Sequence, residues 1–185
     1  MTTPLSRRRF LGLRNLGDHA GRLQPGGRVL IIGASGGGDA SLHVYREPEV
    51  WVPFPSVNHT EMFSIGKGYA VDVPGGTQDI KLRLSGTLHQ GEHAFALTPN
   101  EANDPDMGWN LVGNPYASPL QWDETGWSRK GVSPAAYVLD GRYPGGRFLV
   151  WDGEVGDREF KGLIAQGQGF FIRPTASSPT LTVTP

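Results

Sequence analysis

Short apolar runs, each closed by glycine, proline, asparagine or aspartate, recur along this chain. Runs of this length between turn-forming residues are typical of β-strands, and no longer stretch keeps the 3.6-residue period of an amphipathic helix. The pattern predicts an all-β fold, which we expect to be a jelly-roll-like β-sandwich of about ten strands. The expected strands are Val29–Ile32, Leu42–Tyr45, Val50–Phe54, Tyr69–Val73, Ile80–Leu84, His93–Leu97, Trp109–Val112, Ala136–Leu139, Arg147–Trp151, Phe170–Ile172 and Leu181–Val183.

Glycine and proline are unusually frequent, with 27 and 15 copies in 185 residues, or about 23% against a usual total of roughly 12%. Because they destabilise a helix interior by about 1 and 3 kcal/mol respectively, they favour turns between short elements. The chain is also 37% hydrophobic and 10% aromatic, which is too apolar for a disordered segment. We therefore expect one folded domain over residues 29–185.

The balance of charges and the absence of cysteine exclude several kinds of partner and site. The 17 basic and 18 acidic residues nearly balance, so the chain lacks the basic excess of a nucleic-acid-binding surface, and we expect no nucleic-acid partner. Residues 1–28 are locally basic, and we interpret them as an N-terminal arm or an edge strand protected by charge. The absence of cysteine excludes disulfides and cysteine-based zinc sites. No apolar run approaches the roughly 18 residues of a membrane span.

Two segments of the chain resemble each other at an offset of 101 residues. Gly66–Val71 and Gly167–Ile172 both contain a G-x-G turn followed by an apolar strand, and a further alternating strand follows each of them in register. We therefore predict two similar halves, with pseudo-repeats at about residues 29–86 and 109–185. The alternative is coincidence among the monotonous strands of a sandwich.

A glycine-rich loop at Gly33–Asp39 follows an apolar strand, as the phosphate-binding loops of dinucleotide-binding folds do. The residues after it alternate like a strand, and Pro48 would stop a helix within about two turns. The same loop matches a G-x-S-x-G nucleophile elbow at Ser35, but that motif also needs a following helix. We interpret the loop as a wide turn between strands. No catalytic residue is identified, and we expect a protein that is not an enzyme.

Two other patterns bear on metal binding. His89 and His93 match H-x-x-E-H, but Gly91 interrupts the helix that this motif needs, and in a strand the two residues would lie about 13 Å apart. We predict a hairpin turn there and no metal site. The acidic loops at residues 101–106 and 152–159 lack the spacing of an EF-hand. We expect no cofactor, with a structural calcium ion in one of these loops as the alternative.

The tryptophans offer the clearest candidates for ligand contact. Trp122 and Trp127 lie in a loop with Asp123, where exposed rings can stack on a sugar and the carboxylate can accept hydrogen bonds. Tyr143 is a further candidate. The alternative is that this loop folds over the end of the sandwich and packs its tryptophans inward. The other tryptophans fall in or beside expected strands and are predicted to be core: Trp51, Trp109 and Trp151.

One segment carries a family resemblance. Residues 108–123 read GWNLVGNPYASPLQWD, which resembles the GWNLVGNPYPSPIDWD signature of β-rich modules near the C-terminal end of large bacterial surface proteins exported by the type IX system. Residues 66–71 (GKGYAV), 84–88 (LSGTL) and 164–172 (IAQGQGFFI) resemble further landmarks of these modules in the same order. The signature residues suit structural roles, because Asn114 and Pro115 initiate a turn while Tyr116 and Trp122 can cap the sandwich.

The resemblance implies a non-catalytic, extracellular or cell-surface accessory or adhesion module of a larger secreted protein. Its partners would be a polysaccharide or other surface proteins. A second interpretation is a carbohydrate-binding module that uses exposed tryptophans. A third is a subunit that assembles into a surface layer or filament by pairing of edge strands.

Overall fold

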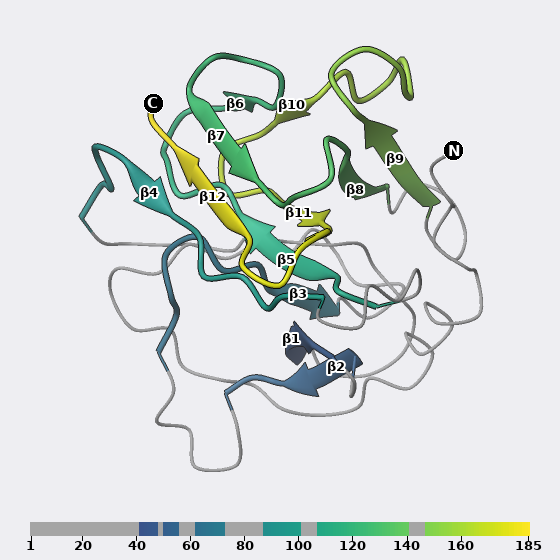
Figure 1. The fold of residues 1–185 in the computed structure, drawn as a ribbon. Coiled ribbons are helices and arrows are strands. Elements are labelled where there is room, and N and C mark those ends of the chain that lie inside the picture. The colour runs from purple at the N-terminus through teal and green to yellow at the C-terminus, as the bar shows by residue number, and fades with distance from the viewer. Residues whose placement is uncertain (1–40, 48–49, 56–61, 73–86, 101–106, 141–146) are drawn as a thin grey trace.

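A computed structural model describes residues 41–47, 50–55, 62–72, 87–100, 107–140 and 147–185. Every regular element in these ranges is a β-strand and all their pairings are antiparallel, which confirms the predicted all-β class (Figure 1). The strands are β1 (Ser41–Arg46), β2 (Val50–Pro53), β3 (Ala70–Asp72), β4 (His93–Ala94), β5 (Asn110–Gly113), β6 (Leu120–Gln121), β7 (Trp127–Lys130), β8 (Ala136–Asp140), β9 (Arg147–Trp151), β10 (Leu163–Ile164), β11 (Gly169–Ile172) and β12 (Thr180–Val183).

Several predictions fall outside these ranges. They are the N-terminal arm, the strands at Val29–Ile32 and Ile80–Leu84, and the glycine-rich loop at Gly33–Asp39. The remaining expected strands all overlap a strand of the structure.

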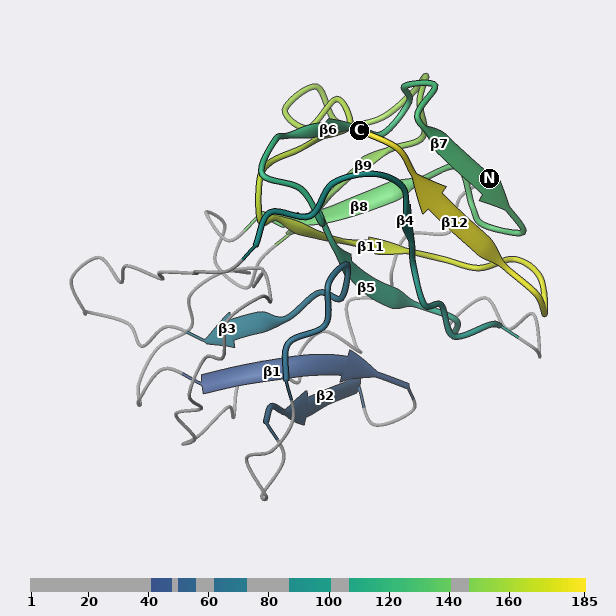
Figure 2. The ribbon, with the colours of Figure 1, turned by 90° about the vertical axis from the view of Figure 1, so that its left-hand side faces the viewer.

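A four-stranded sheet in the order β5-β11-β8-β9 forms the middle of the described molecule. Figure 2 shows the β2-β1-β3 sheet on one side of it and the β4-β12-β7 sheet on the other. The fourth sheet consists of the two short strands β10 and β6. The arrangement is sandwich-like, and the β2-β1-β3 sheet forms an additional layer against the central sheet. A jelly-roll order of strands stays a prediction.

Residues of the central sheet alternate between two cores. Phe170 and Ile172 belong to the cluster that includes Leu181 and Val183 of β12, whereas Phe171 between them faces Trp51 on the opposite side. All four residues of β11 are buried. A strand covered on both faces needs apolar side chains at successive positions, which explains the continuous run in this segment.

Three strands were not expected from the sequence: β6, β7 and β10. Strand β7 reads WSRK and has one apolar residue, so it carries no hydrophobic signal. It is a strand because its backbone pairs with β12, in a register that sets Trp127 opposite Val183 and Lys130 opposite Thr180. Strands β6 and β10 contain two residues each, too few for a periodic pattern.

The two G-x-G segments form turns of the same geometry. In Ser64–Lys67 and in Ala165–Gln168 the fourth N–H donates to the first carbonyl, at 3.3 and 3.1 Å. The third residue of each turn is a glycine, Gly66 or Gly167, with φ of +75° or +68°, a region that favours glycine. Gly113 in β5 donates to the Gly66 carbonyl at 2.9 Å and also pairs with the strand after the second turn. The similarity of the complete halves stays a prediction.

The Asn114 side chain joins three parts of the chain. Its Oδ1 accepts the Tyr116 N–H at 2.9 Å, so the side chain closes the turn at the end of β5. Its Nδ2 donates to Ser118 O at 2.8 Å and lies 3.1 and 3.3 Å from the carbonyls of Ala165 and Ile164. Asn114 is 1% exposed, so its partners would lose these bonds without gaining water.

Two further residues of the signature segment bind backbone. The Tyr116 hydroxyl lies 2.7 Å from Gly91 O and 2.8 Å from Val183 O, which ties the turn before β4 to the end of β12. Asn110 accepts the Thr98 N–H at 2.7 Å and donates to its carbonyl at 2.9 Å. The side chain of Asn110 thus holds the segment at Thr98 as a neighbouring strand would.

The carboxylate of Glu47 connects the β2-β1-β3 sheet to the central sheet. It accepts the Gly108 N–H at 2.6 Å and the Trp109 N–H at 3.3 Å, immediately before β5. The Tyr45 hydroxyl donates to the same carboxylate at 3.0 Å. Bonds to a charged acceptor are stronger than neutral ones, so this contact fixes the end of β1 against the start of β5.

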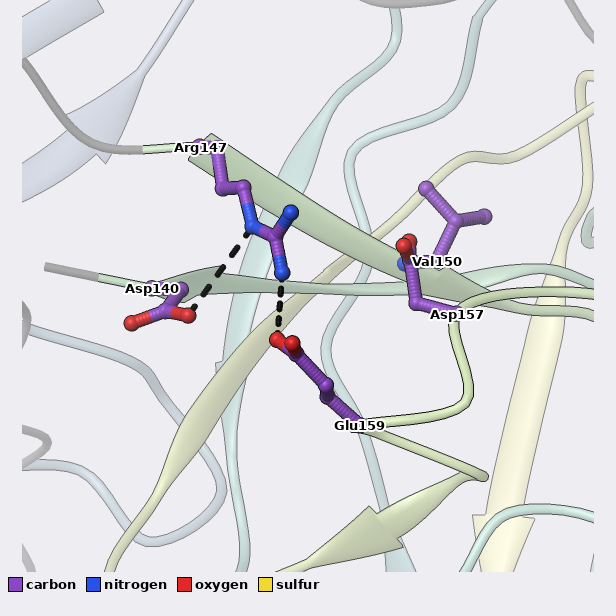
Figure 3. Close-up of polar contacts among 5 residues, drawn as sticks. All are labelled: Asp140, Arg147, Val150, Asp157 and Glu159. Atoms are coloured by element: carbon purple, nitrogen blue, oxygen red, sulfur yellow. Dashed lines mark hydrogen bonds and ion pairs between the residues drawn. The ribbon is translucent and has the colours of Figure 1, made fainter. Parts of the chain in front are cut away.

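Part of the outer edge of β9 is covered (Figure 3). Val150 donates its N–H to the Asp157 carboxylate at 2.9 Å, and its carbonyl accepts the Asp157 N–H at 2.8 Å. At the start of β9, Arg147 contacts the Glu159 carboxylate and lies 4.0 Å from that of Asp140. A charged residue and a returning loop on an edge strand hinder pairing with another chain.

We predict that Asn114→Ala lowers the free energy of unfolding by about 2–4 kcal/mol, because it leaves several buried backbone groups without partners. Urea denaturation followed by circular dichroism measures the effect. Gln166→Ala, at an exposed position of the neighbouring turn, is the control and should change stability by less than about 0.5 kcal/mol. Equal stability of the two variants would contradict the role of Asn114.

Candidate functional site

Trp122, the first of the predicted ligand residues, lies in the core with 0% of its surface exposed. Its ring packs against Trp127 and Phe170, at centroid distances of 4.7 and 5.6 Å, and its Nε1 donates to Pro134 O at 2.6 Å. The prediction that Trp122 stacks on a sugar is therefore wrong, because solvent reaches neither face of the indole. At this residue the alternative holds, in which the loop packs its tryptophan inward.

Trp127 is half-buried and contributes mainly to packing. It stacks on Phe95 at 5.9 Å and lies edge-on to Phe170 at 6.2 Å. Its Nε1 donates to the Gln121 carbonyl at 2.9 Å, which closes the loop between β6 and β7. A ligand-binding role for Trp127 stays a prediction, and Tyr143 lies outside the described residues.

Asp123 is exposed, and the structure brings it to a tryptophan that the sequence had placed in the core. Its Oδ2 lies 3.4 Å from Nε1 of Trp151, at the end of β9, and its Oδ1 accepts a bond from Gln121 Nε2 at 2.6 Å. Arg129 approaches from β7 and attracts the carboxylate. We call these four residues, Gln121, Asp123, Arg129 and Trp151, the Asp123–Trp151 corner.

The backbone turn before β10 supports this corner. Lys161 O accepts a hydrogen bond from Gln121 Nε2 at 2.6 Å, and Lys161 is the one non-glycine residue at positive φ, +48°, in the described part of the chain. The next residue, Gly162, has φ of +73°, and a Cβ on it would lie 2.5 Å from Trp151 Cδ1. A glycine is therefore required where the turn packs against the indole.

Charges in the corner are arranged in a complementary way. The hydrogen bond from Gln121 is the main reason that the pKa of Asp123 lies below its usual value, and the Trp151 N–H and the Arg129 charge add to the effect. Arg129 lies with its Cζ 4.8 Å from the centre of the Trp122 ring, a cation–π contact. Burial lowers the pKa of Arg129, and Asp123 opposes that shift. At neutral pH the corner therefore presents an ionised carboxylate, and the charge of Arg129, whose guanidinium lies over the Trp122 ring, attracts it.

Sequence reasoning placed Asp123 on the surface but missed the other members of the corner. Trp151 ends a strand of apolar residues, so its position indicated a core residue, and it does pack partly against the core. Gln121 and Arg129 carry no signal of their own. The one local sign is Gly162, since a glycine within a predicted loop can mark a close approach of the backbone to another group.

The H-x-x-E-H segment bends at its glycine, where the sequence predicts a turn instead of a helix. The ring centroids of His89 and His93 are 5.1 Å apart, because Gly91, at φ +81°, turns the chain back on itself. The separation of about 13 Å holds only for an extended strand and does not apply here, because the chain bends at Gly91. Burial, and secondly His89, lower the pKa of His93. A Cβ on Gly66 would lie 2.0 Å from His93 Nε2, so this nitrogen faces backbone.

Three carboxylates of the 152–159 loop, those of Asp152, Asp157 and Glu159, bind other groups of the chain. Asp152 Oδ1 accepts the N–H groups of Glu154 and Val155 at 2.9 and 2.7 Å, and these bonds lower the pKa of Asp152. Across the described ranges, no three His, Cys, Asp or Glu side chains are placed to hold a metal ion. The loop at 101–106 lies outside those ranges. A structural calcium ion stays an untested alternative.

Comparison of the chain with family models, with curated proteins and with solved structures finds no match. In the part of the chain that the structure covers, no helix is long and apolar enough to span a membrane. The resemblance of residues 108–123 to the type IX modules stays a prediction.

We predict that Trp122→Ala lowers the free energy of unfolding by about 3–5 kcal/mol, the usual range for removal of a buried tryptophan. Asp123→Ala, next to it and exposed, should change stability by less than about 1 kcal/mol. Urea titration of both variants checks this. A change below about 1 kcal/mol in Trp122→Ala would contradict the core position of Trp122.

Proposed function

We propose that this chain is a non-catalytic β-sandwich module that acts outside the cell as an accessory or adhesion unit of a larger secreted protein. The observation that carries the proposal is how residues 108–123 use their polar side chains. Asn110, Asn114 and Tyr116 all direct hydrogen-bonding atoms to backbone groups of distant segments. Side chains used in this way hold strands together, which suits a structural role for this segment.

The carboxylates that hold elements together support the same proposal. Glu47 binds backbone N–H groups before β5, Asp157 binds Val150 in β9, and Glu159 pairs with Arg147. A catalytic acid or base needs a carboxyl group free to exchange a proton with substrate. Carboxylates that already accept charge-assisted bonds are suited to stabilising loops instead.

Self-assembly through edge strands is supported less well. Strand β9 is one edge of the largest described sheet. This edge is partly covered by the 152–157 loop and by the Arg147–Glu159 pair. Proteins that avoid edge-to-edge association protect their edges in this manner. An accessory module that remains a monomer on its parent protein agrees better with this feature than a filament subunit does.

Surface labelling tests the proposed location and role. An antibody raised against the purified chain should label intact cells of the source organism, and proteinase added outside the cells should remove the label. A cytoplasmic protein, probed in the same samples, is the control and should be labelled only after lysis. Labelling of this chain only after lysis would contradict an extracellular module.

A further inference from the structure

We propose that the Asp123–Trp151 corner is a binding subsite for a neutral polysaccharide. The proposal rests on the accessory or adhesion function proposed above and assigns that function a ligand class and a set of residues. It differs from the sugar site expected from the sequence, because the aromatic partner of Asp123 is Trp151 instead of the buried Trp122.

The corner has both kinds of group that a sugar hydroxyl needs, since a hydroxyl donates one hydrogen bond and accepts others. Gln121 Nε2 is held by Asp123 and by Lys161 O, and no described residue donates to Gln121 Oε1. A carboxylate accepts about four hydrogen bonds, and the described donors to Asp123 do not fill all of them. The Arg129 guanidinium, stacked on Trp122, donates to no described acceptor.

The polar groups of the corner are held in place before any ligand arrives. Asp123 is fixed from one side by Gln121 and from the other by the Trp151 N–H, and the turn at Gly162 packs against the same indole. Fixed side chains lose little conformational freedom on binding, which favours affinity at a small surface site. The positive φ of Lys161 agrees with this interpretation, because strained residues persist where surrounding contacts hold them.

The mixture of groups favours a neutral sugar over other ligands. Asp123 and Arg129 carry opposite charges, so the corner attracts neither an anionic nor a cationic polymer strongly. The half-buried Trp151 provides apolar surface next to the polar groups, and such pairing of an indole with planar polar side chains suits a pyranose ring.

Affinity electrophoresis of the full chain tests the proposal. The purified protein is run through native gels that contain soluble β-glucan, xylan, mannan or galactan, with gelatin and polygalacturonate as protein and anionic probes. We expect at least one neutral polysaccharide to slow the chain. Asp123→Ala and Trp151→Phe should each weaken that binding by at least about tenfold, as expected for loss of a fixed hydrogen bond worth roughly 1.4 kcal/mol.

Glu124→Gln is the matched control, because Glu124 is exposed beside Asp123 but its side chain binds no described residue, and it should bind as the parent chain does. Thermal unfolding of each variant establishes whether it is folded. If Trp151→Phe does not fold, the binding of Asp123→Ala alone decides the test. Retardation by no neutral polysaccharide, retardation only by gelatin or polygalacturonate, or equal binding by Asp123→Ala would overturn the subsite. Surface labelling of a chain that binds none of them would leave the accessory function standing, so the two proposals fail separately.

Discussion

The buried carboxamide of Asn114 is the contact on which the rest of the described structure depends. One side chain closes the turn after β5 and binds the backbone at β10, so it holds the start of the loop that follows β5 against that strand. Trp122, which lies further along the same loop, is buried in the core. An amide is required because its oxygen must accept from an N–H while its nitrogen donates to carbonyls, and no carboxylate or alkyl side chain does both.

The central sheet is likewise held by contacts with other parts of the chain. Its strands are apolar on both faces because a layer of strands covers each side. The Glu47 carboxylate binds the β2-β1-β3 layer to the start of β5. Glycines at positive φ allow sharp turns where this packing leaves no room for a side chain, as at Gly66 against His93. The high content of glycine follows from these close approaches as well as from the number of turns.

The Asp123–Trp151 corner is a consequence of this framework. Two neighbouring residues, Trp122 and Asp123, point to opposite environments, one to the core and one to solvent. The strand β9 and the turn at Gly162 then bring an indole and a carbonyl to the exposed member of that pair. The corner therefore forms where the core ends, and its carboxylate is held by residues of β6 and β9.

The sequence by itself determined the all-β class, most strand positions and the turn at Asn114, because these depend on local chemistry: the spacing of apolar residues, positive φ at glycine and the bond from a side chain to nearby backbone. Only the tertiary structure decided that β7 is a strand, that Trp122 is buried and that Asp123 meets Trp151. Each of these depends on contacts between segments far apart in the chain, such as the pairing of β7 with β12. Such contacts are set by how layers pack, and a local pattern of residues contains no record of that packing.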